Sequence, residues 1–449
     1  MISKKFLLLL AILFGISVAV QAQIVVNETE EEEEEEEEVD EEDELVVIDQ
    51  SGNEEVIDFP EAMTYDLDSL LSEYMAKTYL TSDDCNFKNE SPYYPEEVYI
   101  DRLSRMPTVM EMAHNNVVQN FIDRYAQRLR GTISYCLGAG NFYMPIFEEA
   151  LEAYQIPLEL KYLPVIESAL NPKAVSRVGA TGLWQFMLAT GKQYNLQINS
   201  LVDERRDPIK ASYAAAHLLS DLYKVFGDWN LVIAAYNCGP GNVNKAIQRS
   251  GGSKDYWQIY PYLPRETRGY VPAFIAANYM MTYYSLHNIC PMNSRLPAKT
   301  DTVMVDKKMH LEQIAHVLNL DIDMLRALNP MYRHDIIPGN TQPYALRLPQ
   351  ADISRFIEQQ DAILDYRASE LLTNRIQVEV NDYTPTYYHK SKRSWKKGRK
   401  GRAGRHVKAR RGGKAAKHSK GGKKARAGKK AKGGKKAKGG RKSSKKRRR

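Results

Sequence analysis

Between residues 110 and 287, apolar side chains recur at the three- and four-residue spacing of helices that bury one face. This spacing predicts a series of helices, over Met110–Arg128, Pro145–Tyr154, Pro157–Ser168, Gly182–Tyr194, Pro208–Phe226, Trp229–Tyr236 and Arg265–His287. Asp207 before Pro208 combines an N-cap residue with a proline at the first helical position. No strand-like alternation lasts beyond a few residues before Thr300, so the sequence predicts a mainly α-helical protein.

The pattern changes between Asp301 and Pro349. It predicts two short strands that flank two short helices, in the order Thr302–Val305, Leu311–Leu318, Ile322–Leu328 and Tyr344–Leu348. Asn329-Pro330 and Pro338-Gly339 supply the turns between the second helix and the last strand. The segment is therefore predicted to form a compact βααβ unit.

The first 22 residues have the organisation of a secretory signal peptide. Lys4 and Lys5 precede an apolar run from Phe6 to Val20, and Ala22 provides the small residue at a cleavage site. A run of about 15 apolar residues is short for a membrane span of about 20. The chain is predicted to be exported, with no transmembrane segment in the mature protein.

Charge is separated along the chain. The 449 residues carry a net charge of +7, yet residues 390–449 hold 31 Lys or Arg and no acidic residue. Fifteen of the 56 acidic residues crowd into residues 28–44. Because like-charged segments with few apolar side chains bury too little surface to offset chain entropy, both blocks are predicted to be disordered.

Four cysteines, Cys85, Cys136, Cys238 and Cys290, permit two disulfides in any of three pairings in an exported chain. Cys136 and Cys238 lie within apolar helical patterns, so buried free thiols are the alternative for these two. No group of His, Cys or acidic residues has the spacing of metal ligands. The sequence predicts neither a metal nor a cofactor.

Glu167 is the candidate catalytic residue. It follows the apolar run Leu163-Pro164-Val165-Ile166, and residues 168–202 contain no Asp or Glu. A carboxyl among apolar neighbours has a raised pKa and keeps its proton, as a general acid requires. A solvated glutamate at a helix end is the alternative.

Several ordered motifs carry a specific resemblance. Glu167-Ser168, Ser176, Gly182-Leu183-Trp184-Gln185, Ala235-Tyr236-Asn237 and Glu266-Thr267-Arg268-Gly269-Tyr270-Val271 follow one another at fitting distances. They resemble the motifs of family 1 lytic transglycosylases, and most closely the membrane-bound lytic murein transglycosylase D subfamily. The resemblance covers about residues 156–284 and implies a lysozyme-like α-helical fold.

The resemblance also implies a role for each matching residue. Glu167 corresponds to the single catalytic acid, which Tyr236 is expected to position through a hydrogen bond. Substrate-binding roles are implied for Ser176, Gln185, Met187, Tyr236 and Tyr270, and supporting roles for Ser168 and Asn237. Trp184 is expected to be buried behind the saccharide groove.

Residues 301–349 resemble a LysM domain. The matching segments are Leu311–Ala315 in the first helix, Leu325–Pro330 at the end of the second helix, and Ile337–Gly339 before the last strand. LysM modules bind glycans that contain N-acetylglucosamine, so the resemblance implies a glycan-binding unit. A helical hairpin without a ligand is the alternative.

Together these patterns predict a lysozyme-like catalytic domain followed by a βααβ LysM-like domain, between two disordered tails. The predicted divisions are a signal peptide (1–22), an acidic segment (23–57), a helical region packed on the catalytic lobe (58–154), the catalytic domain (155–290), the LysM-like domain (300–350) and a basic tail (388–449).

The function predicted from the sequence is exported peptidoglycan lytic transglycosylase activity, in the periplasm or cell envelope. A glycosidase that works with two carboxyls needs a second one about 5–9.5 Å from the first, and Glu159, Asp203 or Glu204 could supply it. A hydrolytic muramidase would then be the better interpretation, and a noncatalytic peptidoglycan-binding protein is the third. The basic tail resembles linker-histone tails, which bind nucleic acid through phosphate contacts. In an exported protein, anionic envelope polymers are instead its expected partners.

Overall fold

The computed structural model describes residues 44–48, 54–64, 80–81, 90–294, 296–372 and 375–380. All of these described residues belong to one compact unit. The predicted signal peptide and the predicted basic tail lie outside the described residues. Among the described residues, no helix has both the length and the apolar character needed to cross a bilayer.

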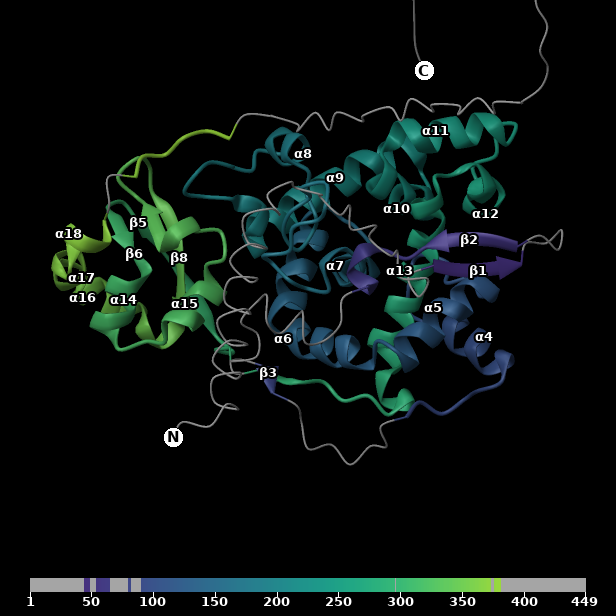
Figure 1. Ribbon diagram of the computed structural model, residues 1–449, viewed down its shortest axis with the longest axis horizontal. Helices are drawn as coiled ribbons and strands as arrows, with labels where there is room; N and C mark the ends of the chain where they lie inside the picture. The colour runs from purple at the N-terminus through teal and green to yellow at the C-terminus, as the bar shows by residue number, and fades with distance from the viewer. Residues whose placement is uncertain are drawn as a thin grey trace, which may run out of the picture. The chain divides into compact units, whose positions relative to one another are not determined.

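Helices dominate residues 96–287, as predicted (Figure 1). They are α4 (Glu96–Ser104), α5 (Asn116–Gln127), α6 (Arg130–Ala153), α7 (Leu163–Ser168), α8 (Leu188–Gln193), α9 (Pro208–Phe226), α10 (Trp229–Cys238), α11 (Pro240–Arg249), α12 (Tyr256–Ile259) and α13 (Arg265–Tyr283). Short 3-10 helices connect them at η3 (Leu158–Tyr162), η4 (Glu204–Arg206), η5 (Tyr260–Tyr262) and η6 (Tyr284–His287).

Helix α9 has the bounds that the sequence predicts. The Asp207 carboxylate accepts hydrogen bonds from the backbone N–H groups of Ile209 and Lys210, which satisfies two donors of the first turn. The helix ends at Gly227, whose φ of 70° is readily adopted only by glycine. Local capping chemistry therefore fixes both ends of this helix.

The structure corrects several helix predictions. Helix α5 begins at Asn116 rather than at Met110, and the segment predicted as one helix over Pro157–Ser168 divides into η3 and α7. Helix α6 begins at Arg130 rather than at Pro145, because tight tertiary packing supports its first half: a Cβ at Gly138 would lie 2.5 Å from the Met292 carbonyl oxygen. The predicted helix over Gly182–Tyr194 is reduced to α8. Gly182, with φ 87°, and Gln185, with φ 47°, turn the backbone out of the right-handed helical region.

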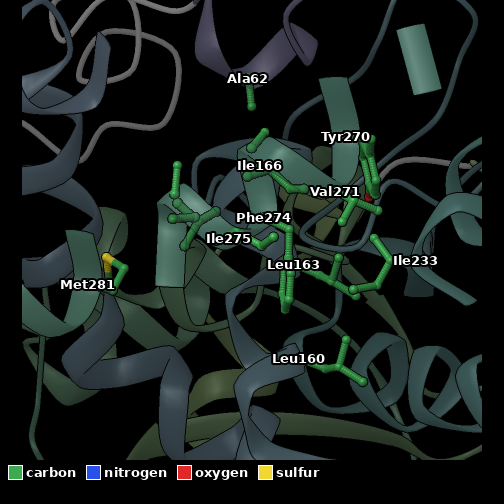
Figure 2. Close-up of a cluster of buried hydrophobic side chains, with 14 of the residues drawn as sticks. Ala62, Leu160, Leu163, Ile166, Ile233, Tyr270, Val271, Phe274, Ile275 and Met281 are labelled. Atoms are coloured by element: carbon green, nitrogen blue, oxygen red, sulfur yellow. The ribbon is translucent and has the colours of Figure 1, made fainter. Parts of the chain in front are cut away.

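Helix α13 lies at the centre of the helical lobe, where α5, α6, α7 and α10 contact it (Figure 1). Figure 2 shows part of this core, in which Ile166 of α7 lies beside Val271 and Phe274 of α13. All three side chains are at most 1% exposed. Each buried side chain of this size contributes about 1.5–3 kcal/mol of hydrophobic free energy, so α7 is anchored on its apolar side.

A β-hairpin precedes the helices. Strands β1 (Glu44–Ile48) and β2 (Glu54–Asp58) pair antiparallel, and η2 (Glu61–Met63) follows them. Ile57 is fully buried, and a Cβ at Gly269 of α13 would lie 2.5 Å from the Asp58 carbonyl oxygen. The described part of the segment predicted to be disordered, residues 23–57, is therefore folded where it meets α13.

A second strand pair joins distant parts of the chain, with β3 (Leu80–Thr81) antiparallel to β4 (Asn293–Ser294). The remaining elements form the LysM-like region. They are β5 (Thr300–Val305), β6 (Lys308–His310), α14 (Leu311–Leu318), α15 (Ile322–Leu328), η7 (Arg333–Asp335), β7 (Ile336–Pro338), β8 (Tyr344–Pro349), η8 (Gln350–Asp352), α16 (Ile353–Glu358), α17 (Gln360–Asp365) and α18 (Ala368–Leu371). Strand β5 pairs antiparallel with β8, and β6 pairs antiparallel with β7.

The LysM-like region has its own apolar core. Helices α14 and α15 of this region have the predicted bounds. The core extends beyond the predicted boundary at residue 350, because Phe356 of α16 and Ile363 of α17 are fully buried in it. Leu201 and Val202, from the loop between α8 and α9, belong to this same core. The helical lobe therefore contributes part of the apolar interior of the LysM-like region.

The cysteines divide into two kinds. Cys136 and Cys238 are free thiols, while Cys290 is disulfide-bonded. The alternative of two disulfides is thus wrong, and the alternative of free thiols at Cys136 and Cys238 is correct. Burial raises the pKa of the Cys136 thiol, so this group behaves as a small apolar core residue.

Candidate active site

Glu167 lies at the C-terminal end of α7. Pro164 lies in the first turn of this short helix, and Leu163 through Ile166 are buried against neighbouring elements. The chain leaves the helix through Ala169 and Leu170, whose φ values of 47° and 60° are uncommon for residues with side chains. Packing on three sides of α7, from η2, η3 and α13, holds this geometry. The Glu167 side chain is left half-buried at the end of an apolar helix.

Burial raises the pKa of Glu167 from an ordinary value of 4.5 to about 8. The Tyr270 hydroxyl donates a hydrogen bond to Glu167 Oε1, and this bond acts in the opposite direction by lowering the pKa. The negative charges of Glu266 and Glu61 raise it again. Glu167 therefore holds its proton at neutral pH, as a general acid must.

The two site tyrosines have different partners. Tyr270 of α13 donates to Glu167, whereas the Tyr236 hydroxyl of α10 donates to the Trp184 carbonyl oxygen at 2.7 Å. The structure thus gives Tyr270 the hydrogen bond to the glutamate that the sequence assigned to Tyr236. Burial raises the pKa of Tyr236, and the charge of Glu167 raises it further, which indicates that Tyr236 still lies close to the carboxyl.

The Gly182–Gln185 motif forms a tight loop against the backbone of Arg205. A Cβ at Gly182 would lie 1.9 Å from the Arg205 carbonyl oxygen, so only glycine fits there. Gln185 Nε2 donates to the Gly182 carbonyl oxygen at 2.9 Å and so braces the loop from within. Met187, at the end of the loop, is 43% exposed.

Trp184 and Ser168 join this loop to the protein interior. Trp184 is fully buried, and its Nε1 donates to Ser212 Oγ at 2.9 Å. The Ser168 hydroxyl is shared between the Pro164 carbonyl oxygen at 3.1 Å and the Leu183 carbonyl oxygen at 3.0 Å. Ser168 therefore connects the end of the glutamate's helix to the loop.

Ser176 lies in the turn that precedes the loop. Its hydroxyl accepts a hydrogen bond from the Ala180 backbone N–H at 3.0 Å. Isolated β-bridges pair Val175 with Thr181 and Thr181 with Phe186, which tie this turn to the Gly182–Met187 loop. The structure thus places Ser176, Gln185 and Met187 on one connected piece of backbone, and Ser168 joins that piece to α7.

The sequence analysis assigned no role to two carboxyls that lie near Glu167. Glu266, in the first turn of α13, and Glu61, in η2, are the acidic residues whose charges act on Glu167. Glu266 precedes Tyr270 by four residues, so helical spacing would have placed both on one face of α13. No sequence pattern indicated that Glu61 lies near Glu167, because the position of η2 beside α7 depends on how the β1–β2 segment folds.

Asn237 connects the end of α10 to the start of α13. Its Oδ1 accepts a hydrogen bond from Thr267 Oγ1 at 2.8 Å, and a hydrogen bond between its side chain and the Glu266 carboxyl lowers the pKa of that carboxyl. Burial and the charges of Asp58 and Glu61 outweigh this effect, so the pKa of Glu266 is raised. Asn237 therefore connects the end of α10 to Thr267 and Glu266 of α13.

The three carboxyls proposed from the sequence as second catalytic groups have other partners. Glu159 accepts a hydrogen bond from the Met110 backbone N–H at 2.8 Å. Asp203 pairs with two guanidinium groups, and Glu204 pairs with Lys210 at 2.5 Å. All three are thus occupied in structural contacts. In the part of the chain that the structure describes, no group of three or more His, Cys, Asp or Glu residues is arranged to hold a metal ion.

Two family models match the chain. The transglycosylase SLT domain matches residues 144–259, and the lytic transglycosylase MltD, LysM-like domain matches residues 299–365. The predicted fold class is confirmed, with a mostly helical SLT domain of the lysozyme-like kind followed by a small LysM-like region that contains strands.

Several curated proteins are similar to parts of this chain. Membrane-bound lytic murein transglycosylase D of Escherichia coli (strain K12) is 30% identical over 213 residues, which are 45% of this chain and 46% of the relative. A putative tributyltin chloride resistance protein of Alteromonas sp. (strain M-1) is 40% identical over 23% of this chain and 51% of its own. Soluble lytic murein transglycosylase of Escherichia coli (strain K12) is 35% identical over 26% of this chain and 19% of its own.

Among solved structures, the 70 kDa soluble lytic transglycosylase SLT70 from Escherichia coli is 31% identical, with a TM-score of 0.29. The match covers 32% of this chain and 24% of that chain. This chain spans less than half the length of membrane-bound lytic murein transglycosylase D. The chain thus contains an SLT domain and an MltD-type LysM-like domain, and it is homologous to that relative, which confirms the resemblance drawn from the motifs.

Proposed function

We propose that this protein is a peptidoglycan lytic transglycosylase. It cleaves the β-1,4 bond between N-acetylmuramic acid and N-acetylglucosamine and leaves a 1,6-anhydromuramoyl end. The observation that carries the proposal is the raised pKa of Glu167, about 8, in a half-buried carboxyl that Tyr270 orients. The SLT match and the homology to named murein transglycosylases support it.

In the first step, Glu167 donates its proton to the bridging glycosidic oxygen as the bond to the anomeric carbon breaks. The leaving sugar departs as a neutral alcohol, and positive charge develops on the muramoyl ring. The substrate's own N-acetyl oxygen stabilises that charge. Tyr270, which donates to the carboxyl, stabilises the carboxylate that this step creates.

In the second step, the Glu167 carboxylate removes the proton from the muramoyl 6-hydroxyl, and that oxygen attacks the anomeric carbon. The glutamate is protonated again by the proton of the 6-hydroxyl, and no water is consumed. Because the attack is intramolecular, it gains effective molarity over attack by water.

The contacts of the other carboxyls favour this scheme over hydrolysis with two carboxyls. A hydrolase needs an ionised second carboxylate as nucleophile or base. Glu266, whose charge raises the pKa of Glu167, has a hydrogen bond to the Asn237 side chain. Glu159, Asp203 and Glu204 are held in other contacts.

The remaining site residues receive proposed roles from their positions. Ser176, Gln185 and Met187 line the saccharide path on the braced loop, and Tyr236 and Tyr270 line it from α10 and α13. Ser168 and Asn237 support the backbone around Glu167. The protein acts in the periplasm or cell envelope, where its basic tail binds anionic polymers.

The test uses purified full-length protein and isolated sacculi, with products identified by mass spectrometry. Glu167→Gln should reduce product release by at least about 10³-fold, because the amide donates no proton. Glu152→Gln, at an exposed glutamate of α6, is the matched control and should retain full activity. Anhydromuramoyl ends support the proposal. Reducing ends would indicate a muramidase, and binding without release would indicate an adhesion protein.

A further inference from the structure

An ion-pair network links the LysM-like region to the loops around the candidate site. Asp203, in the loop before α9, is fully buried. Its carboxylate accepts from Arg205 Nε and Nη2, both at 2.9 Å, in a two-pronged pair. Arg333 of η7 donates to the same carboxylate at 2.7 Å. Asp203 is thus shared between a residue of the helical lobe and a residue of the LysM-like region.

Arg205 also contacts the two loops that hold the proposed substrate residues. Its remaining terminal nitrogen, Nη1, donates to the carbonyl oxygens of Gly179 and Phe186, both at 3.2 Å. Gly179 lies in the Ser176 turn, and Phe186 lies between Gln185 and Met187. The backbone of Arg205 also presses on Gly182. One guanidinium therefore fixes both loops that carry the proposed substrate residues.

Backbone contacts reinforce the same junction. The Arg333 N–H donates to the Leu201 carbonyl oxygen at 2.7 Å, and the Asp203 N–H donates to the Met331 carbonyl oxygen at 3.0 Å. Leu201 and Val202 are buried in the core of the LysM-like region. Contacts with both the helical lobe and the LysM-like region therefore stabilise the segment that contains Asp203.

The electrostatics agree with a firmly held network. Burial acts to raise the pKa of Asp203, but the hydrogen bonds and charges of Arg205 and Arg333 outweigh it, and the pKa is lowered. The Asp203 charge also acts on Arg206. Burial lowers the pKa of Arg206, and the Asp203 charge raises it by a smaller amount. The carboxylate stays ionised at neutral pH, and a bidentate Arg–carboxylate pair fixes direction as well as distance.

We infer that Arg333 of the LysM-like region is a positioning residue for the saccharide-binding loops, acting through Asp203 and Arg205. The LysM-like region is then a structural part of the catalytic apparatus as well as a glycan-binding unit. This role in substrate binding rests on the proposed transglycosylase function. The effect of Arg333 on the loops can be measured whether or not the protein has transglycosylase activity.

The experiment is hydrogen exchange on the full chain, read over residues 176–187. Amides of Thr181 and Phe186 pair with each other's carbonyl oxygens, so they report the integrity of the loops. Arg333→Met should raise their exchange rates about three- to tenfold, because Asp203, the partner of Arg205, loses one of the two guanidinium groups that hold it. Arg333→Lys, which keeps the charge, should restore part of the protection.

Arg326→Met is the matched control. Arg326 is paired with Asp323 and Asp335 inside the LysM-like region and is as exposed as Arg333. Its loss should leave exchange over residues 176–187 unchanged. Equal effects of Arg333→Met and Arg326→Met on these amides would overturn the inference.

Kinetics with soluble peptidoglycan fragments add the second readout. Arg333→Met should raise KM about three- to tenfold with little change in kcat and no shift in the pH dependence that Glu167 governs, because the loops bind sugar and the acid is untouched. A fall in kcat alone would contradict the role in binding. If the wild-type protein releases no product, the proposed function fails, while the exchange data still decide the coupling.

Discussion

Glu167 and Asp203 are two carboxyls, both removed from water, in neighbouring regions of one helical lobe, and their pKa values move in opposite directions. Around Glu167 lie a tyrosine hydroxyl and two further acids. Around Asp203 lie two guanidinium groups at hydrogen-bonding distance. Burial penalises both anions, so the partner decides the outcome. One carboxyl keeps its proton and is suited to chemistry, and the other stays ionised and holds structure together.

Removing the charge of Asp203 should have the largest effect on stability. Asp203→Asn leaves the buried Arg205 guanidinium without its counter-charge, and breaking a buried pair in this way costs about 3–5 kcal/mol. The free energy of unfolding in urea measures this loss. Asp323→Asn, in a partly exposed pair with Arg326, should cost only about 0–1 kcal/mol. Similar losses for the two variants would show that the Asp203 network is weak.

Replacing the ionisable carboxyl of Glu167 should have the opposite effect on the free energy of unfolding. Below pH 4.5 the carboxyl is neutral in the folded and the unfolded chain, so it does not affect the free energy of unfolding. Between pH 4.5 and about 8 the unfolded chain releases the proton while the folded chain retains it, so stability falls as pH rises. Glu167→Gln avoids this loss and should be more stable than wild type at pH 7 by about 1–3 kcal/mol, allowing for solvent screening.

Urea unfolding at pH 4 and pH 7 measures the Glu167 effect. The gain should be present at pH 7 and absent at pH 4. Asp203 contributes in the reverse sense, because its lowered pKa gives stability at neutral pH that is lost on acidification. A Glu167→Gln variant that is less stable than wild type at pH 7 would contradict the raised pKa.

The smallest effects should appear in the pH dependence of activity. Loss of the proton from Glu167 ends acid catalysis, so kcat/KM should fall as pH rises through about 8. Glu266→Gln removes a negative charge that raises this pKa and should move the fall about half a unit lower. Tyr270→Phe removes a hydrogen bond that lowers the pKa and should move the fall about half a unit higher.

Initial rates on soluble peptidoglycan fragments across pH 5–10 would measure both shifts. Glu152→Gln serves again as the exposed control and should leave the profile in place. Shifts of the same sign in Glu266→Gln and Tyr270→Phe would show that these two residues do not control the protonation of Glu167.

Much of the fold followed from local patterns. Helices α9, α14 and α15 have the predicted bounds, because capping residues and apolar spacing lie within each segment. The Gly182–Met187 loop did not follow, because its turn is imposed by contact with the Arg205 backbone. The β1–β2 hairpin was hidden by the acidic composition around it, since the burial of Ile57 depends on α13, more than 200 residues later in the chain.

For the site, the sequence alone identified Glu167 and the ordered motifs around it, because an isolated acid in an apolar helical segment is a local feature. Tertiary structure decided its partners. The tyrosine that contacts Glu167 lies 103 residues away in the chain, and Arg333 lies 130 residues from Asp203. Periodicity states which face of a helix is buried, whereas a pKa depends on which charges and donors meet at that face, and only the folded chain brings those groups together.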